Sequence, residues 1–231
     1  MVVNLWEEVM GNLKKTLSFL ITSLFIFSLI GCSANDTNKS GDKGGSNNRQ
    51  SKKVVIEKNT AKAVTLSAGT HKVGKEIKPG RYVIKAVSGS GNLFSRNSPN
   101  DRNINVILGP TEDDTWMKLS SYTTDLKAGE KIKIDGIEST KLIPTPDKRI
   151  FRKILTPGSW TVGKDIKPGD YTIKAVRGTG NIFSDNGEDD INEILAKHPD
   201  KDYGQVSKIH VELNKGEIIT SDVPKIKLVE D

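Results

Sequence analysis

Few residues of this 231-residue chain are of types that could perform covalent or metal-centred chemistry. Cys32 is the single cysteine, and His71, His198 and His210 are the three histidines. No two histidines lie at a metal-ligand spacing, and the sequence lacks the G-x-S-x-G, P-loop and H-E-x-x-H motifs. We therefore expect a protein that is not an enzyme, with no catalytic residues, metal ligands or cofactor.

An acidic stretch, Asp185–Asp190, is the one segment whose composition suggests calcium. Its carboxylates do not follow the spacing of an EF-hand loop. The matching stretch of the first half of the chain, Arg96–Asn103, carries Arg96 and Arg102 instead. We interpret the acidic stretch as a solvated loop.

A long internal repeat organises the elements that must position any site. The segment 73–97 returns 89 residues later as 162–186, with 18 identical positions out of 25 and no gap. The similarity continues with a two-residue shift, so that Ile104 corresponds to Ile191, Trp116 to Tyr203 and Leu126 to Leu213. The pattern predicts two homologous domains of one fold.

Each copy has the pattern of short β-strands. Tyr82, Ile84 and Ala86 alternate with Val83, Lys85 and Val87, as in a strand with one buried face. Lys78-Pro79-Gly80-Arg81 suits a type II turn, and Gly89–Asn92 is expected to break the strand. Further strands are expected at 104–108, 116–126, 131–134 and 137–143. We predict an all-β protein with two tandem antiparallel domains of sandwich or barrel type.

The N-terminal segment has the pattern of an export signal. Lys14 and Lys15 precede the apolar run Thr16–Ile30, which is followed by Gly31 and Cys32. Leu29-Ile30-Gly31-Cys32 resembles the lipobox of bacterial lipoproteins, and this resemblance implies cleavage before Cys32 and its attachment to a diacylglycerol. Because Glu7 and Glu8 are acidic where such a signal is basic, we expect translation to start at Met10 rather than Met1.

Composition divides the remainder of the chain. Residues 33–53 are polar except for Ala34, which predicts a flexible tether. The expected organisation is a signal peptide at 1–31, lipidated Cys32 with its tether at 32–53, β domains at 54–143 and 150–231, and a linker at 144–149. We expect an extracellular face of a cell membrane, of Gram-positive type, as the location.

The recurrent V-G-K-x-I-K-P-G-x-Y segments, Val73–Tyr82 and Val162–Tyr171, support a second resemblance. They resemble a small β domain of secreted and lipid-anchored Gram-positive proteins, which has the pattern V-G-x-D-I-x-P-G-x-Y. Asp165 keeps the acidic position, whereas Glu76 replaces it in the first copy. The resemblance implies an all-β domain and no particular activity.

Aromatic and polar residues that recur in both copies are the candidates for a binding surface. We predict that Tyr82, Tyr171, Phe94 and Phe183 are core residues, because they fall at alternating strand positions. Exposed aromatics could stack on sugar rings, with lysines and asparagines supplying hydrogen bonds. The candidate binding residues are Trp116, Tyr203, Trp160, Lys85, Lys174, Asn92 and Asn181.

Three functional hypotheses follow. The net charge of +6 suits anionic surfaces in general, whereas no nucleic-acid-binding signature is present. We expect a non-catalytic lipoprotein that binds a cell-wall polymer, a glycan or a surface protein. The alternatives are a structural or accessory subunit of an envelope complex, and a precursor of a peptide pheromone, since Leu24–Gly31 resembles the octapeptides released from some lipoprotein signals.

Overall fold

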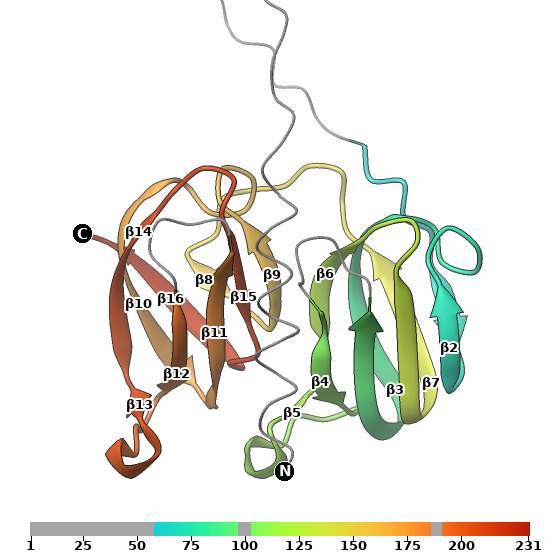
Figure 1. Cartoon of the computed structure of the whole chain (residues 1–231), viewed down its shortest axis with the longest axis horizontal. Coiled ribbons are helices and arrows are strands. Elements are labelled where there is room, and N and C mark those ends of the chain that lie inside the picture. The colour runs from blue at the N-terminus through green and yellow to red at the C-terminus, as the bar shows by residue number, and fades with distance from the viewer. Residues whose placement is uncertain (1–57, 97–102, 186–190) are drawn as a thin grey trace, which may run out of the picture. The chain divides into compact units, whose positions relative to one another are not determined.

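The computed structural model describes residues 58–96, 103–185 and 191–231, which are almost entirely β-structure (Figure 1). The all-β prediction is therefore confirmed. Within these ranges no helix is long and apolar enough to cross a membrane. The signal peptide, Cys32, the tether and most of the acidic stretch Asp185–Asp190 lie outside the described residues.

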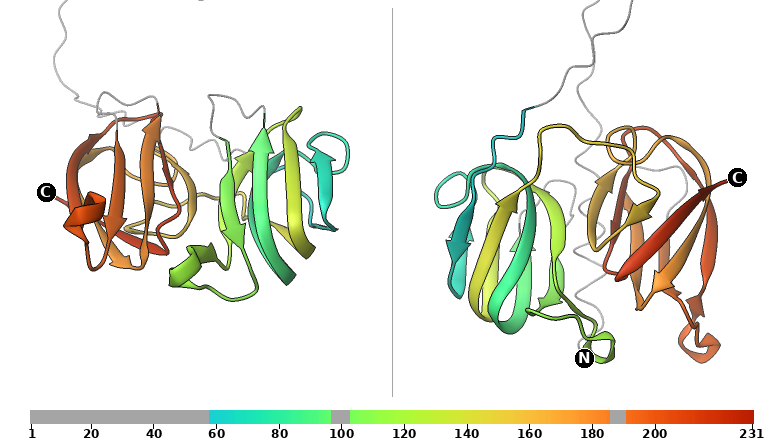
Figure 2. Two further views of the ribbon diagram at one scale, coloured as in Figure 1. Left: turned by 60° about the horizontal axis from the view of Figure 1, so that its bottom comes forward. Right: turned by 180° about the vertical axis from the view of Figure 1, so that it is seen from behind.

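The second repeat consists of two sheets. One sheet has the order β14-β10-β16-β8, and the strands β9-β15-β11-β12-β13 form the other layer (Figures 1 and 2). The strands of the first sheet are β14 (Lys208–Leu213), β10 (Gly169–Arg177), β16 (Lys225–Glu230) and β8 (Ile154–Leu155). Those of the second layer are β9 (Gly158–Thr161), β15 (Ile218–Ser221), β11 (Thr179–Asp185), β12 (Asn192–Ala196) and β13 (Gln205–Val206).

The first repeat has the same pairing, but two of its strands run through both layers. In one layer, the first half of β3 pairs with β6 and with the last residues of β7, and those residues of β7 also pair with β1. In the other layer, the second half of β3 pairs with β4 and with the first residues of β7, which also pair with β2. Its strands are β1 (Val64–Leu66), β2 (Gly69–Lys72), β3 (Gly80–Arg96), β4 (Asn105–Leu108), β5 (Lys118–Leu119), β6 (Tyr122–Leu126) and β7 (Lys131–Pro144).

The predicted break at Gly89–Asn92 is wrong for the first repeat, because β3 continues through it with shifts of register against β7. The corresponding position of the second repeat, Gly178, does separate β10 from β11. Gly89 and Gly178 have nearly the same φ, +73° and +71°, a conformation that glycine adopts without steric cost. The backbone conformation of this glycine is therefore the same in both repeats. The repeats differ in strand pairing, because β3 stays paired with β7 across the region whereas β10 ends before Gly178.

The predicted type II turn at Lys78–Arg81 is also wrong. The tight turn lies earlier in the motif, where Gly74 N donates to Ile77 O at 2.7 Å. Gly80 instead begins β3 with φ of +142°. Glycine is required at this position, because a side chain would overlap Asn59 and Ala61. The motif is a turn followed by a strand, displaced by a few residues from the expected position.

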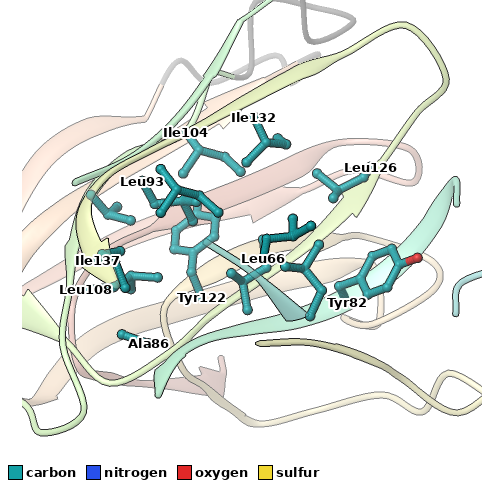
Figure 3. Close-up of a cluster of buried hydrophobic side chains, with 14 of the residues drawn as sticks. Leu66, Tyr82, Ala86, Leu93, Ile104, Leu108, Tyr122, Leu126, Ile132 and Ile137 are labelled. Atoms are coloured by element: carbon teal, nitrogen blue, oxygen red, sulfur yellow. The ribbon is translucent and has the colours of Figure 1, made fainter. Parts of the chain in front are cut away.

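Each repeat encloses its own hydrophobic cluster, one formed by residues 66–142 and one by residues 155–228. Tyr82, Ile84 and Ala86 are buried while Lys85 and Val87 are exposed, as alternation predicts. Figure 3 shows Tyr82 and Ala86 among the side chains of the first cluster. Two predicted core residues are corrections: Phe183 is 42% exposed, and Phe94 is half-buried and lies outside the first cluster.

Candidate functional site

The two most exposed large aromatic side chains among the described residues are Trp116 and Tyr203. Trp116 is 71% exposed and Tyr203 is 72% exposed. Trp116 ends the 3-10 turn η2 (Asp114–Trp116), and Tyr203 ends η3 (Lys201–Tyr203). The prediction of a strand from 116 onward is therefore wrong at its start, since the strand β5 begins at Lys118.

Both aromatic loops are held by the same hydrogen bonds. Asp113 Oδ1 accepts from Thr115 N at 3.0 Å, and Asp200 Oδ1 accepts from Asp202 N at 3.0 Å. The turns end in left-handed residues, Met117 and Gly204. These caps fix the backbone beneath each aromatic ring, so that little conformational entropy remains to be lost when a ligand binds.

Contacts of the first aromatic loop place it beside the second repeat. Glu112 forms an ion pair with Arg177, and an added side chain at Gly178 would lie 3.2 Å from Asp114 Oδ1. The Gly178 carbonyl also accepts a hydrogen bond from Lys197 N, four residues before η3. The turn at Gly178 is therefore close to the loop that carries Trp116 and bonded to the residues that precede η3.

Lys85 and Lys174 are exposed on the outer faces of β3 and β10. Neither forms an ion pair among the described residues. In each case the residue opposite on the neighbouring strand is another lysine, Lys141 for Lys85 and Lys227 for Lys174. These cross-strand lysine pairs were not predicted from the sequence, because register depends on the tertiary fold.

Asn92 and Asn181 are half-buried rather than displayed. Asn181 Nδ2 donates to Asp222 Oδ2 at 3.0 Å, and Asn181 N donates to Asp222 Oδ1. Burial raises the pKa of the Asp222 carboxyl, while the hydrogen bonds from Asn181 lower it. The side chain of Asn181 therefore links β11 to the segment after β15, and its role in binding stays a prediction.

Trp160 is also not a surface residue, because it is only 4% exposed. Its ring lies between the guanidinium groups of Arg81, 5.0 Å from the ring centroid, and Arg152, at 5.3 Å. Trp160 Nε1 donates to Thr156 O at 2.9 Å. Because Arg81 belongs to the first repeat, Trp160 anchors the contact between repeats and is a correction to the predicted binding set.

Sequence reasoning missed a cluster of four charged side chains around this contact. Arg81 Nη1 lies 2.5 Å from Asp125 Oδ2, and Arg149 pairs with both Asp125 and Asp165. Burial lowers the pKa of Arg81, whereas Asp125 and Asp165 raise it. The sequence contains one signal that could have pointed to this cluster: the two copies differ in charge at the position where the first has Arg81 and the second has Asp170.

An open cleft of about 880 Å³ lies beside the charged cluster. Arg81, Asp125 and Arg149 contribute to its wall, with Lys58 and Phe151 among the other lining residues. In the part of the chain that the structure describes, no group of three or more His, Cys, Asp or Glu side chains is arranged to hold a metal ion.

No protein-family model, curated protein or solved structure matches the chain.

Proposed function

We propose that this protein is a lipid-anchored extracellular lipoprotein whose duplicated, non-catalytic β repeats bind a sugar-bearing polymer of the cell wall. The observation that carries the proposal is the pair Trp116 and Tyr203, which occupy matching capped loops and are both more than 70% exposed. Exposed tryptophan and tyrosine side chains on an ordered backbone are frequent anchors of binding surfaces.

A sugar ring suits these loops better than an anionic group does. The apolar face of a sugar can stack on an indole or phenol ring, and neighbouring carboxylates can accept hydrogen bonds from its hydroxyls. Asp113 and Asp114 adjoin Trp116, while Asp200 and Asp202 adjoin Tyr203. The same carboxylates would repel a phosphate or carboxylate brought to the ring.

Two loops within one chain allow simultaneous contact with one polymer. The second contact then becomes intramolecular, which raises the apparent affinity without any new type of interaction. The lipid on Cys32 would hold the repeats at the membrane surface, and the polar tether would let them reach the wall.

Sedimentation of the purified chain with purified cell-wall material tests the binding proposal. Trp116→Ala and Tyr203→Ala should each weaken retention, and the double variant should weaken it by about tenfold or more. Phe151→Ala is the matched control, because Phe151 is also exposed, at 58%, but lines the cleft, to which neither aromatic loop contributes.

Equal retention of the double variant and the original chain would contradict the proposal. Recovery of one cross-linked protein instead of wall material would favour the accessory-subunit alternative. All variants should keep the thermal midpoint of the original chain, since neither aromatic side chain is packed.

The membrane anchor has its own test. Cys32→Ser should abolish incorporation of labelled fatty acid and leave an unprocessed precursor in cells. Normal processing of this variant would show that Cys32 is not the lipidation site.

A further inference from the structure

Three lysines lie side by side across three adjacent strands of the second repeat. Lys174 on the central strand β10 is opposite Lys208 of β14 and also opposite Lys227 of β16. All three residues are exposed. Neighbouring strands are about 4.8 Å apart, so the three ammonium groups form a short row on the outer face of the sheet. We call Lys208, Lys174 and Lys227 the lysine row.

The first repeat carries part of the same arrangement. Lys85 and Lys141 are opposite each other in the register that places Lys174 opposite Lys227. A lysine on an edge strand can be explained as protection against aggregation. That explanation does not apply to Lys174, because β10 has a hydrogen-bonded neighbour on each side.

The lysine row costs stability, because like charges directly opposite each other on a sheet repel. None of the ion pairs between described residues includes Lys174, Lys208 or Lys227. Glu230 pairs with Lys153 and Lys167, and Asp231 accepts from Thr172. Asp170 and Glu212, the other carboxylates of the sheet, lie opposite each other four residues along β10 and β14 from the row and form no ion pair with it. The positive charge of the row is therefore not compensated within the described structure.

The surroundings of the row are open and partly apolar. Val176, two residues after Lys174, is exposed, and so is Ile154, the residue opposite Lys227. An outer sheet face of this kind presents charge to an extended ligand rather than enclosing a small one. Lysine ammonium groups on flexible stems bind phosphate as point charges and tolerate variation in the spacing of the anions.

We propose that the outer face of β14-β10-β16, centred on Lys174, binds a linear polyanion with repeated phosphate groups. The phosphates neutralise the lysine row, and this removes the repulsion between its lysines that is present in the unbound protein. The polyanion releases its counterions on binding, so the affinity falls as salt concentration rises. This surface includes neither of the loops that carry Trp116 and Tyr203.

Titration of the purified chain with long-chain inorganic polyphosphate, at low and at physiological salt, tests the proposal. The double variant Lys174→Gln/Lys227→Gln should bind about tenfold or more weakly, with a shallower salt dependence. Lys75→Gln/Lys78→Gln is the matched control, since it removes the same charge from two exposed lysines of the turn in the first repeat. The control should bind within about twofold of the original chain.

Thermal unfolding supplies a second readout. Lys174→Gln should unfold at the same temperature as the original chain or higher, because it removes two repulsive cross-strand pairs. If Lys174→Gln loses binding and also has a lower thermal midpoint, the variant is misfolded. The test then passes to Lys227→Gln, on the neighbouring strand, which must bind more weakly with an unchanged thermal midpoint.

Three results would overturn the proposal. One is the absence of polyphosphate binding at low salt, and another is an equal loss in the Lys75/Lys78 control, which would indicate a net-charge effect alone. The third is binding to anionic phospholipid vesicles but not to polyphosphate, which would identify a membrane surface instead. Trp116→Ala/Tyr203→Ala should bind polyphosphate normally, so failure of the sugar-binding proposal leaves this test intact.

Discussion

Arg81 Nη2 lies 3.6 Å from Asp165 Oδ2, although the two residues belong to different repeats. The side chain of Arg81 is 6% exposed and that of Asp165 is 3% exposed. Arg81 Nη2 also donates to Ser159 O at 2.9 Å. A buried cation of one repeat is therefore satisfied both by Asp125 of its own repeat and by oxygen atoms of the other, which ties the stability of the first repeat to the presence of the second.

Arg81→Ala should lower the free energy of unfolding by about 3 kcal/mol, the lower end for breaking a buried ion pair, because Arg149 still neutralises Asp165. Urea unfolding measures the loss. Asp170→Ala is the control at the matching position of the second repeat. Asp170 is exposed, so this change should cost less than about 0.5 kcal/mol. Equal effects of the two changes would contradict a specific role for Arg81.

Gly158→Ala should separate the strands that join the repeats. Thr123 pairs with Gly158, and a side chain at Gly158 would overlap the Thr123 carbonyl oxygen. Gly69→Ala is the matched control, because Gly69 has a φ of +144°, close to the +148° of Gly158. A Cβ added at Gly69 would have its nearest neighbour 3.6 Å away and would therefore not clash.

Both changes should carry the cost of a strained φ, about 1–2 kcal/mol. Only Gly158→Ala should add a clash, about 1–3 kcal/mol more. Chemical unfolding of the two variants side by side would reveal the difference, and indistinguishable midpoints would count against the strand contact.

Thr140→Val should stabilise the chain. Thr140 is fully buried, and its hydroxyl has no hydrogen-bond partner among the described residues. The second repeat has Ile226 in the same register, opposite Ala175 as Thr140 is opposite Ala86. Removal of an unsatisfied hydroxyl should add up to about 1 kcal/mol to the free energy of unfolding. Thr140→Ser, which keeps the hydroxyl and loses the methyl group, should destabilise; a destabilised valine variant would show that the hydroxyl has a partner.

Asp222 should make part of the stability depend on pH. Burial raises the pKa of its carboxyl in the folded chain above the ordinary value of 3.8, so the folded state binds the proton more tightly than the unfolded state. The contribution of Asp222 is therefore full below about pH 4 and is lost as the pH rises through the folded pKa. Urea unfolding between about pH 4 and 7 should show the stability of the original chain falling relative to Asp222→Asn. A constant difference across this range would refute the linkage.

Much of the fold follows from local pattern. The alternation of Tyr82, Ile84 and Ala86 with exposed neighbours predicts the buried face of β3, because successive strand residues point to opposite sides. The prediction of Phe94 and Phe183 as core residues fails for both, because Phe94 is half-buried outside the first cluster and Phe183 is exposed. Alternation identifies which residues share a face, but what covers that face depends on distant segments.

The candidate site shows the same division. Trp116 and Tyr203 could be selected from sequence because each is an aromatic residue preceded by aspartates at a matching position. Trp160 could not be rejected from sequence, since its burial depends on the packing of the second cluster and on contact with Arg81, 79 residues earlier in the chain. The lysine row likewise depends on the pairing of three strands that are separate in sequence.

The sequence by itself determined that the chain is a duplicated β-structure, because hydrophobic alternation, turn residues and the repeat are all local or directly comparable along the chain. Only the tertiary structure decided which aromatic residues stay exposed, which charges are buried together and which lysines become neighbours. These properties arise from strand register and from the contact between repeats. Both are long-range consequences of packing, and no short stretch of residues encodes either one.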